Sequence, residues 1–338
     1  MWPMIPWNFG TGPLLVLADA SLRSMVLFLG GLLVLLALRT RRAAIRHAVW
    51  TVVACGMLVL PILSLSVPAV PLRLLPAPPP QVDLPVQFVS TQVPAAVAAS
   101  QRFPDWRVAS VAGWLVVVLV LFGRMTLGYF FARRLFRRGI PVELPPAVAD
   151  LGRGCRYELR EAASISVPLT LGWRYAIVLL PTGWRNWDHA KFRAVMAHEL
   201  AHVRRSDWLI MLLSTVNKCV FWFHPLAWWL ERRLGTLAEE ACDDDCLLAL
   251  DDREQYARTL LEMAAAVRNG QGRLGWEAMA MARASQVRKR LERVMDQTRK
   301  VLPGMSRARW AAAMLCAAPV VCGLAVLQLA PAQTVPGG

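Results

Sequence analysis

Charged residues are scarce in this chain, and acidic residues are the scarcer kind. Only 18% of the 338 residues are charged, whereas 56% are hydrophobic, and the mean hydropathy is +0.40. This balance excludes an ordinary soluble enzyme, in which about a quarter of the residues are charged. The composition instead predicts a membrane protein.

The shortage of acidic residues leaves a net charge of +15, from 38 Lys and Arg against 23 Asp and Glu. Nucleic-acid-binding proteins are often this basic. Here, however, the basic residues cluster beside apolar runs, and the sequence has no nucleic-acid-binding motif or long basic stripe. That pattern is typical of the cytoplasmic flanks of membrane spans, so we expect no direct nucleic-acid partner.

The chain also lacks a disulfide framework and a cleaved signal peptide. Its seven Cys show no paired spacing, and Cys242 and Cys246, four residues apart, either bind a metal or, as we favour, pack on a helix in a reducing compartment. Residues 1–17 contain no Lys or Arg, so they do not resemble the basic start of a signal peptide.

Long apolar runs are abundant. A bilayer-crossing helix needs about 20 apolar residues, and four stretches meet that length. Arg23 and Arg124 lie near the ends of their spans, where we expect them to reach the interface, although a buried functional Arg124 is the alternative. The four predicted spans are residues 22–38, 47–67, 108–131 and 310–330.

Basic clusters predict the orientation of these spans. By the positive-inside rule, both termini lie outside and the large region before the last span lies in the cytoplasm. The external link 68–107 contains the run Pro76 to Pro80, which favours extended polyproline. The clusters are Arg39, Arg41, Arg42 and Arg46; Arg133, Arg134, Arg137 and Arg138; and Arg299, Lys300, Arg307 and Arg309.

The chain therefore divides into a three-span membrane region (1–134), a cytoplasmic domain (135–308), a fourth span (309–330) and a short external tail (331–338). At about 170 residues, the cytoplasmic domain is long enough to bury its own core. Residues 166–172 and 175–180 are typical of strands, and residues from 188 to about 295 are mostly helical in pattern, which predicts an α+β domain.

The most informative motif is His198-Glu199-Leu200-Ala201-His202. Residues four apart lie on one face of a helix, so both imidazoles can bind one metal ion. Zinc accepts imidazole ligands, and a catalytic zinc site uses three protein ligands and a water. Glu199 stands beside the first ligand, where its carboxylate can take a proton from that water.

A third ligand is available in a later acidic helix. Glu239 and Asp243 are four apart, so one can bind zinc while the other orients a ligand His. Glu240 and Asp244 form the neighbouring face and are the alternative pair, and an acidic face that merely contacts solvent is the other interpretation.

Residues 208–230 form an apolar stretch that separates the two parts of this site. A straight spanning helix there would hold His202 and Glu239 at least about 35 Å apart, at 1.5 Å per residue. His224-Pro225 favours a break, because proline disrupts the helix that precedes it. We therefore expect a helical hairpin, packed in the domain or against the membrane surface, in which His224 caps or packs rather than entering the site.

In this ordered set of features the chain resembles the BlaR/MecR-type membrane metallopeptidases, relatives of the gluzincin zinc proteases, over nearly its whole length. The resemblance implies Glu239 as the third ligand. Members of that family sense β-lactams outside the cell, and their signalling leads to cleavage of a cytoplasmic helix-turn-helix repressor. The features are residues 39–50, residues 166–172, His198 to His202 followed by Asp207, Phe223-His224-Pro225 and Glu239 to Asp243.

The chain departs from that family after the fourth span. Only residues 331–338 follow it, so we expect no external penicillin-binding sensor domain and no β-lactam sensing through one. The signal, the substrate and the residue that stabilises the oxyanion are left open, as is the oligomeric state.

We therefore predict a membrane zinc endopeptidase in which His198, His202 and Glu239 bind zinc and Glu199 is the base. Asp207 and Asp243 orient the His ligands. The substrate is a cytoplasmic protein. Strand 167–171 or strand 176–180 either offers an edge to which the substrate pairs or is an ordinary core strand. The basic stretch 286–300 is interpreted as the flank of span four, with docking of a partner or an anionic lipid as the alternative.

Two rival functions are weighed against this one. An intramembrane site-2-type protease also carries this motif, but Arg204, Arg205 and Asp207 follow it directly and disfavour a position inside the bilayer. A non-enzymatic signal transducer is disfavoured because both His, the Glu base and a third ligand occur together.

Overall fold

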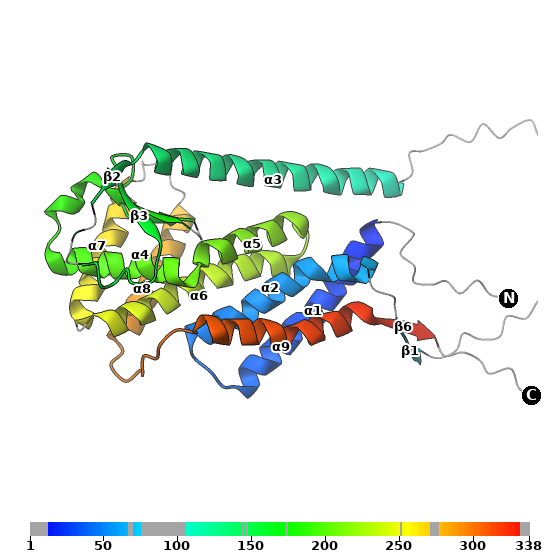
Figure 1. The fold of residues 1–338 in the computed structure, drawn as a ribbon. Helices are drawn as coiled ribbons and strands as arrows, with labels where there is room; N and C mark the ends of the chain where they lie inside the picture. Colours follow the sequence, from blue (N-terminus) through cyan, green and yellow to red (C-terminus); the bar gives the residue numbers. More distant parts are fainter. Residues whose placement is uncertain are drawn as a thin grey trace, which may run out of the picture.

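The computed structural model describes residues 13–66, 70–75, 106–143, 145, 148–172, 175–250, 252–270 and 277–331. Most of the described chain is helical, with one four-stranded sheet and one pair of short parallel strands (Figure 1). The Pro-rich run 76–80 and the tail beyond Pro331 lie outside the described residues, so those predictions stand as they were made.

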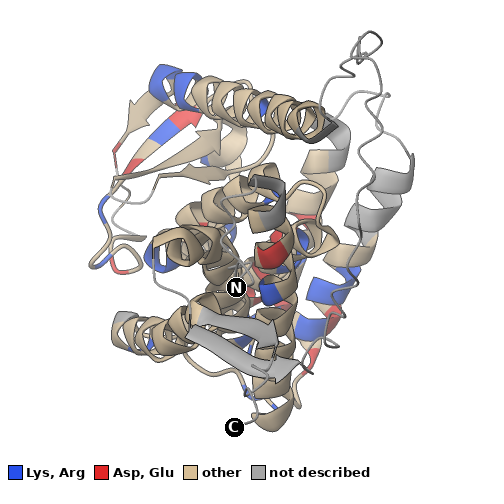
Figure 2. Cartoon of the chain, turned by 90° about the vertical axis from the view of Figure 1, so that its right-hand side faces the viewer, with Lys and Arg blue, Asp and Glu red and all other residues tan. Residues whose placement is uncertain are grey.

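Four helices are long and apolar enough to cross a membrane, as expected: α1 (Pro13–Ala37), α2 (Ala43–Ser66), α3 (Trp106–Arg138) and α9 (Arg307–Val326). The helices that face the viewer in Figure 2 are mostly tan, because these apolar helices hold few charged residues. The last helix is shorter than predicted, since residues 327–331 form a strand instead.

Two short strands fix the relative direction of two spans. β1 (Val70–Leu75) follows α2, β6 (Leu327–Pro331) follows α9, and the two strands pair in parallel. Helices α2 and α9 therefore run in the same direction. A short link joins the end of α1 to the start of α2, and these two helices run in opposite directions (Figure 1). The first part of the expected external link is thus a strand.

Arg23 lies in the interior of α1, because this helix begins at Pro13, nine residues before the start of the predicted span. That its side chain reaches the membrane interface stays a prediction. Its side chain is buried, pairs with Asp19 at 2.7 Å, and donates 2.6 Å hydrogen bonds to the carbonyls of Leu324 and Ala325. It thereby ties α1 to the end of α9.

The sheet has the strand order β2-β3-β5-β4. β5 (Ala176–Pro181) is internal, since it pairs in parallel with β3 (Tyr157–Ala162) and antiparallel with β4 (Leu169–Leu171). The prediction that strand 176–180 offers a free edge is therefore wrong, whereas β4 is an edge strand. On the other side, β3 pairs antiparallel with β2 (Ile140–Val142).

Helix α4 (His189–Arg205) packs against this sheet. Apolar residues of β5 and α4 share one core, which also takes in residues of α6 (Pro225–Ala249) and α7 (Arg253–Gly270). The 3-10 turn η2 (Thr182–Asn186) leads from β5 towards α4. Helix α8 (Glu277–Met295) lies against α6 and α7.

The apolar stretch 208–230 folds back on itself, as predicted. Helix α5 (Asp207–Val220) ends before Phe221, and α6 begins at Pro225. His224 caps α6, because its Nδ1 accepts a 3.1 Å hydrogen bond from the backbone N–H of Leu226. The hairpin packs against α2: Asn217 is fully buried, and its amide contacts the sulfur of Met57 at 3.4 Å.

Candidate metal centre

The helix that carries the His-Glu-x-x-His motif is fixed at both ends. Asp188 caps α4, since its Oδ1 accepts a 2.7 Å hydrogen bond from the backbone N–H of Lys191. At the other end Ser206 adopts a left-handed conformation, with φ 56° and ψ 36°, which few residues other than Gly adopt. This turn starts α5 at once, so Asp207 folds back beside His202.

The motif residues and Glu239 converge across two helices. The Nε2 atoms of His198 and His202 lie 3.3 Å apart. Nε2 of His198 is 3.4 Å from Oε2 of Glu239, and Nε2 of His202 is 3.5 Å from Oε1 of the same carboxylate. With zinc–ligand bonds of about 2.0–2.1 Å, a tetrahedral ion holds its ligand atoms about 3.4 Å apart. The three side chains therefore lie about as close together as the ligands of one small divalent metal.

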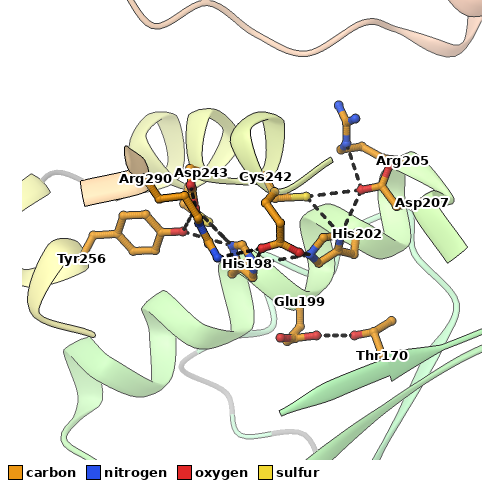
Figure 3. Close-up of polar contacts among 12 residues, drawn as sticks. Thr170, His198, Glu199, His202, Arg205, Asp207, Cys242, Asp243, Tyr256 and Arg290 are labelled. Atoms are coloured by element: carbon orange, nitrogen blue, oxygen red, sulfur yellow. Dashed lines mark hydrogen bonds and ion pairs between the residues drawn. The ribbon is translucent and has the colours of Figure 1, made fainter. Parts of the chain in front are cut away.

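His202 is held by Asp207. Its Nδ1 lies 2.9 Å from Oδ2 of Asp207, which also accepts from Nε of Arg205 at 3.2 Å (Figure 3). Burial lowers the pKa of His202, but the hydrogen bond to Asp207 and the nearby charge of Glu239 outweigh it and raise that pKa to about 9. Burial likewise opposes the charge on Asp207, yet its bond to His202 lowers the pKa of the carboxyl to about 2.

His198 is held through a tyrosine. Its Nδ1 lies 3.0 Å from the hydroxyl of Tyr256, which donates a 2.7 Å hydrogen bond to Oδ1 of Asp243 (Figure 3). The direct separation of Asp243 from His198 is 3.7 Å, longer than a hydrogen bond. Asp243 thus faces the His that we expected it to serve, but Tyr256 stands between them.

Arg290 of α8 pairs with the carboxylates of Asp243 and Glu239. Its guanidinium donates to both oxygens of Asp243, at 2.7 and 2.9 Å, and lies 2.8 Å from Oε2 of Glu239. Burial raises the pKa of Glu239. Its contacts with His198 and His202, and the charge of Arg290, outweigh burial, so the net effect is a lowered pKa. Glu239 therefore stays ionised beside the two imidazoles.

The alternative acidic pair points elsewhere. Asp244 binds Arg293 and Arg299 at 2.7 Å each, and Glu240 lies 3.2 Å from Arg293. These ion pairs tie α6 to α8 and to the segment that follows it. The basic stretch that we interpreted as the flank of span four is thus partly an internal partner of α6.

Glu199 lies outside the ligand triangle. Its Oε2 accepts a 2.6 Å hydrogen bond from the hydroxyl of Thr170, on the edge strand β4 (Figure 3). The carboxylate is thereby held between the motif helix and the sheet. The link also places β4 next to the candidate metal centre.

Cys242 joins a second group that could hold a metal, with His202 and Asp207. Its sulfur lies 3.3 Å from Nδ1 of His202 and 3.4 Å from Oδ2 of Asp207. Burial raises the pKa of the Cys242 thiol well above its usual value, so the thiol stays protonated and is a poor ligand. The group of His198, His202 and Glu239 is the better metal site.

The motif search did not find Tyr256, Arg290 or Thr170. No spacing rule connects them to the His pair, since they come from α7, α8 and β4. The burial of Asp243, which the sequence did not predict, is what requires such partners, because a buried acidic group needs them.

A family model described as BlaR1 peptidase M56 matches residues 15–294. The chain is similar to the regulatory protein BlaR1 of Bacillus licheniformis, with 33% identity over 95 residues, which make up 28% of this chain and 16% of that protein. It is also similar to the methicillin resistance mecR1 protein of Staphylococcus aureus, with 26% identity over 104 residues, or 30% of this chain and 18% of that protein. The matched segments therefore span less than a fifth of each relative.

Proposed function

This chain belongs to the BlaR1 peptidase M56 family, a family of metallopeptidases, and from that premise we propose that it is a membrane-anchored zinc endopeptidase in a signal-transduction pathway. One observation carries the proposal: two imidazoles and a carboxylate meet at separations of 3.3, 3.4 and 3.5 Å, with a further carboxylate beside them. That donor set is the one a gluzincin-like zinc site uses.

His198, His202 and Glu239 would hold the zinc. When bound, zinc supplies a coordinated water of lowered pKa and polarises the scissile carbonyl. Asp207 fixes the tautomer of His202 by accepting from its Nδ1, and so leaves Nε2 free to bind the metal. Tyr256 serves His198 in the same way, backed by Asp243.

Glu199 is the proposed base. One of its oxygens is occupied by the hydroxyl of Thr170, and the other is left to accept a proton from the attacking water and to return it to the leaving amine. The hydrogen bond from Thr170 restrains the carboxylate.

The substrate would bind as an extended strand against β4. This strand pairs with β5 on one side, and among the described strands nothing pairs with its other side. A peptide added there lies beside Thr170 and hence beside Glu199, so main-chain pairing would bring a scissile bond to the metal centre.

We propose that the domain from residue 135 to residue 308 works on the cytoplasmic face of a bacterial plasma membrane, with both termini external. The Arg-rich ends of α2, α3 and α9 all lie at the end of the spans that adjoins this domain (Figure 1). The substrate is then a cytoplasmic protein, and the resemblance to the BlaR/MecR type favours a helix-turn-helix repressor. Helix α4 is not one of the four apolar helices, which disfavours an intramembrane protease.

The test separates metal binding from cleavage. The full chain and its Glu199→Ala variant are purified in detergent, bound zinc is quantified, and each is incubated with a co-expressed repressor. Glu254→Ala, on an exposed face of α7, is the matched control. We expect zinc in all three proteins and fragments from the wild type and the control only. Equal cleavage by Glu199→Ala would overturn the assignment of the base, and zinc in none would favour a non-enzymatic transducer.

A further inference from the structure

A second cavity lies between the membrane helices and the peptidase domain, separate from the metal centre. Its volume is about 810 Å³, within the range of about 300–1,000 Å³ typical of small-molecule sites. Apolar side chains of α2, α5 and α9 make up most of its wall. Its lining includes Thr51, Cys55, Leu209, Leu213, Trp310 and Met314.

The cavity lies at the domain end of the spans. Thr51 is eight residues from the start of α2, and Trp310 is three residues from the start of α9. Because α2 and α9 run in the same direction, both contributions come from the same side of the membrane. At 1.5 Å per residue, Thr51 is only about 12 Å along its helix, a depth that the upper part of an acyl chain occupies.

One wall of the cavity is cationic. Arg204 and Arg205, which follow the motif helix's last His, both line it. The Arg205 side chain is only 9% exposed, and its Nη2 has no hydrogen-bond partner among the described residues. A buried guanidinium nitrogen without a partner is costly, so an anion at this wall that accepted a hydrogen bond from the Arg205 side chain would be stabilised.

One acidic group shares the wall. Asp245 also lines the cavity, and burial raises the pKa of its carboxyl. The Asp245 carboxylate additionally accepts from the backbone N–H of Gly304. The lining therefore holds two guanidinium groups and one carboxylate, so positive charge is in excess on this wall.

We propose that this cavity binds one anionic membrane phospholipid. An acyl chain lies against the apolar wall, and the phosphate of the headgroup accepts hydrogen bonds from Arg204 and from the free Nη2 of Arg205. A phosphate with a planar guanidinium partner is a strong charge-assisted pair. The combination of an apolar wall, a depth near the membrane surface and a guanidinium with one unused donor fits an anionic lipid.

Arg205 also connects the cavity to the metal centre. Its Nε holds Oδ2 of Asp207, and the same oxygen holds Nδ1 of His202. A phosphate on Nη2 leaves that contact intact and fixes the guanidinium plane. Lipid binding does not depend on the proposed peptidase activity, because it requires only the cavity, Arg204 and Arg205.

The experiment measures lipid binding directly. The full chain is stripped of lipid in a neutral detergent and titrated with phosphatidylglycerol or with phosphatidylcholine of the same chains, and bound lipid is counted by native mass spectrometry. We expect phosphatidylglycerol to bind at least about tenfold more tightly. Arg204→Gln and Arg205→Gln should each lower that affinity about tenfold, and Ala249→Trp, which fills the cavity, should abolish it.

Controls make the outcome decisive. Arg138→Gln, at the end of α3 and outside the cavity, should bind lipid as the wild type does. Thermal unfolding identifies any variant that fails to fold, and Arg204→Gln, which does not contact Asp207, serves if Arg205→Gln does. Equal binding of the two lipids, or normal phosphatidylglycerol binding by a folded Ala249→Trp, would overturn the proposal. Displacement of phosphatidylglycerol by an equal concentration of inorganic phosphate would also overturn the proposal, because the site would then need no acyl chain.

Discussion

The hydroxyl of Tyr256 donates a 2.7 Å hydrogen bond to Oδ1 of Asp243, and both side chains are buried. The tyrosine comes from α7 and the aspartate from α6, so the bond joins two helices directly behind the candidate metal centre. Burial, and the negative charge of Asp243, raise the pKa of Tyr256 well above its usual value, so the phenol stays a donor. The neutral phenol of Tyr256 then positions His198, and the carboxylate of Asp243 holds the phenol in place.

Removing that hydroxyl should weaken metal binding. In Tyr256→Phe the Nδ1 of His198 loses its only oxygen partner within 3.5 Å among the described residues. Loss of a partner behind a metal ligand costs about 10- to 100-fold in affinity, so we expect a decrease of that size in zinc affinity, measured by competition with a chelator. Tyr175→Phe, at a 70% exposed position, is the control and should be neutral. An unchanged zinc affinity in Tyr256→Phe would show that His198 needs no such support.

Replacing the partner of the second His should have a comparable effect. In Asp207→Asn the amide no longer carries the charge that holds His202 and Arg205. Zinc affinity should fall about 10- to 100-fold, because the imidazole loses its orienting carboxylate. The matched change Asp150→Asn, at an exposed ion pair with Arg193, should leave zinc affinity as it is. Equal effects of the two changes would contradict a specific role for Asp207.

The tether of the proposed base can be cut without touching a metal ligand. Thr170→Val keeps the shape of the side chain but removes the donor to Glu199. We expect kcat to fall about tenfold while bound zinc stays at the wild-type level, since misplacement of a base costs rate and not metal affinity. Thr236→Val, where the hydroxyl bonds only to the backbone of its own helix, is the control. A fall in zinc content would mean that Thr170 acts on the fold of the centre rather than on the base.

The metal-free protein should lose stability as the pH rises. The pKa of His202 is about 9 in the folded chain and 6.5 in the unfolded chain, so its protonated form stabilises the fold. That contribution is fully present below pH 6.5 and disappears as the pH rises through 9, for a total of at most about 3 kcal/mol.

Thermal unfolding in a chelator between pH 6 and pH 9.5 measures this loss. Asp207→Asn should flatten the profile, because it removes the hydrogen bond that raises the pKa. With zinc bound the slope should be smaller or reversed, since the metal needs the neutral imidazole. A flat profile in the metal-free wild type would contradict the charged His202–Asp207 pair.

Local patterns in the sequence predicted the helices but not their partners. Apolar length predicted four long helices, and His224-Pro225 predicted the turn in the hairpin, because chain length and proline act locally. The surroundings of Arg23 were not predicted, because apolar composition did not reveal that α1 starts at Pro13 or that this side chain bonds to the end of α9.

The motif residues show the same division. The spacing of His198 and His202 is a property of one helix, so their common face follows from the sequence. Their partners depend on how α5 and α7 turn back. The turn at Ser206 has a left-handed conformation, which a serine in the sequence does not predict. Tyr256 and Arg290 come from helices that touch the site only in the folded chain. The roles of all these residues stay predictions until the variants are measured.

Helix α6 is an uninterrupted rod that joins the membrane to the metal centre. Its first half packs in the same core as α1 and α2, and its second half carries Glu239. About 21 Å of stiff helix, at 1.5 Å per residue, separates Pro225 from that carboxylate. A rigid-body tilt of the spans would therefore move the Glu239 carboxylate relative to His198 and His202. If these residues bind zinc as proposed, through bonds of about 2 Å, that movement would open or close the coordination.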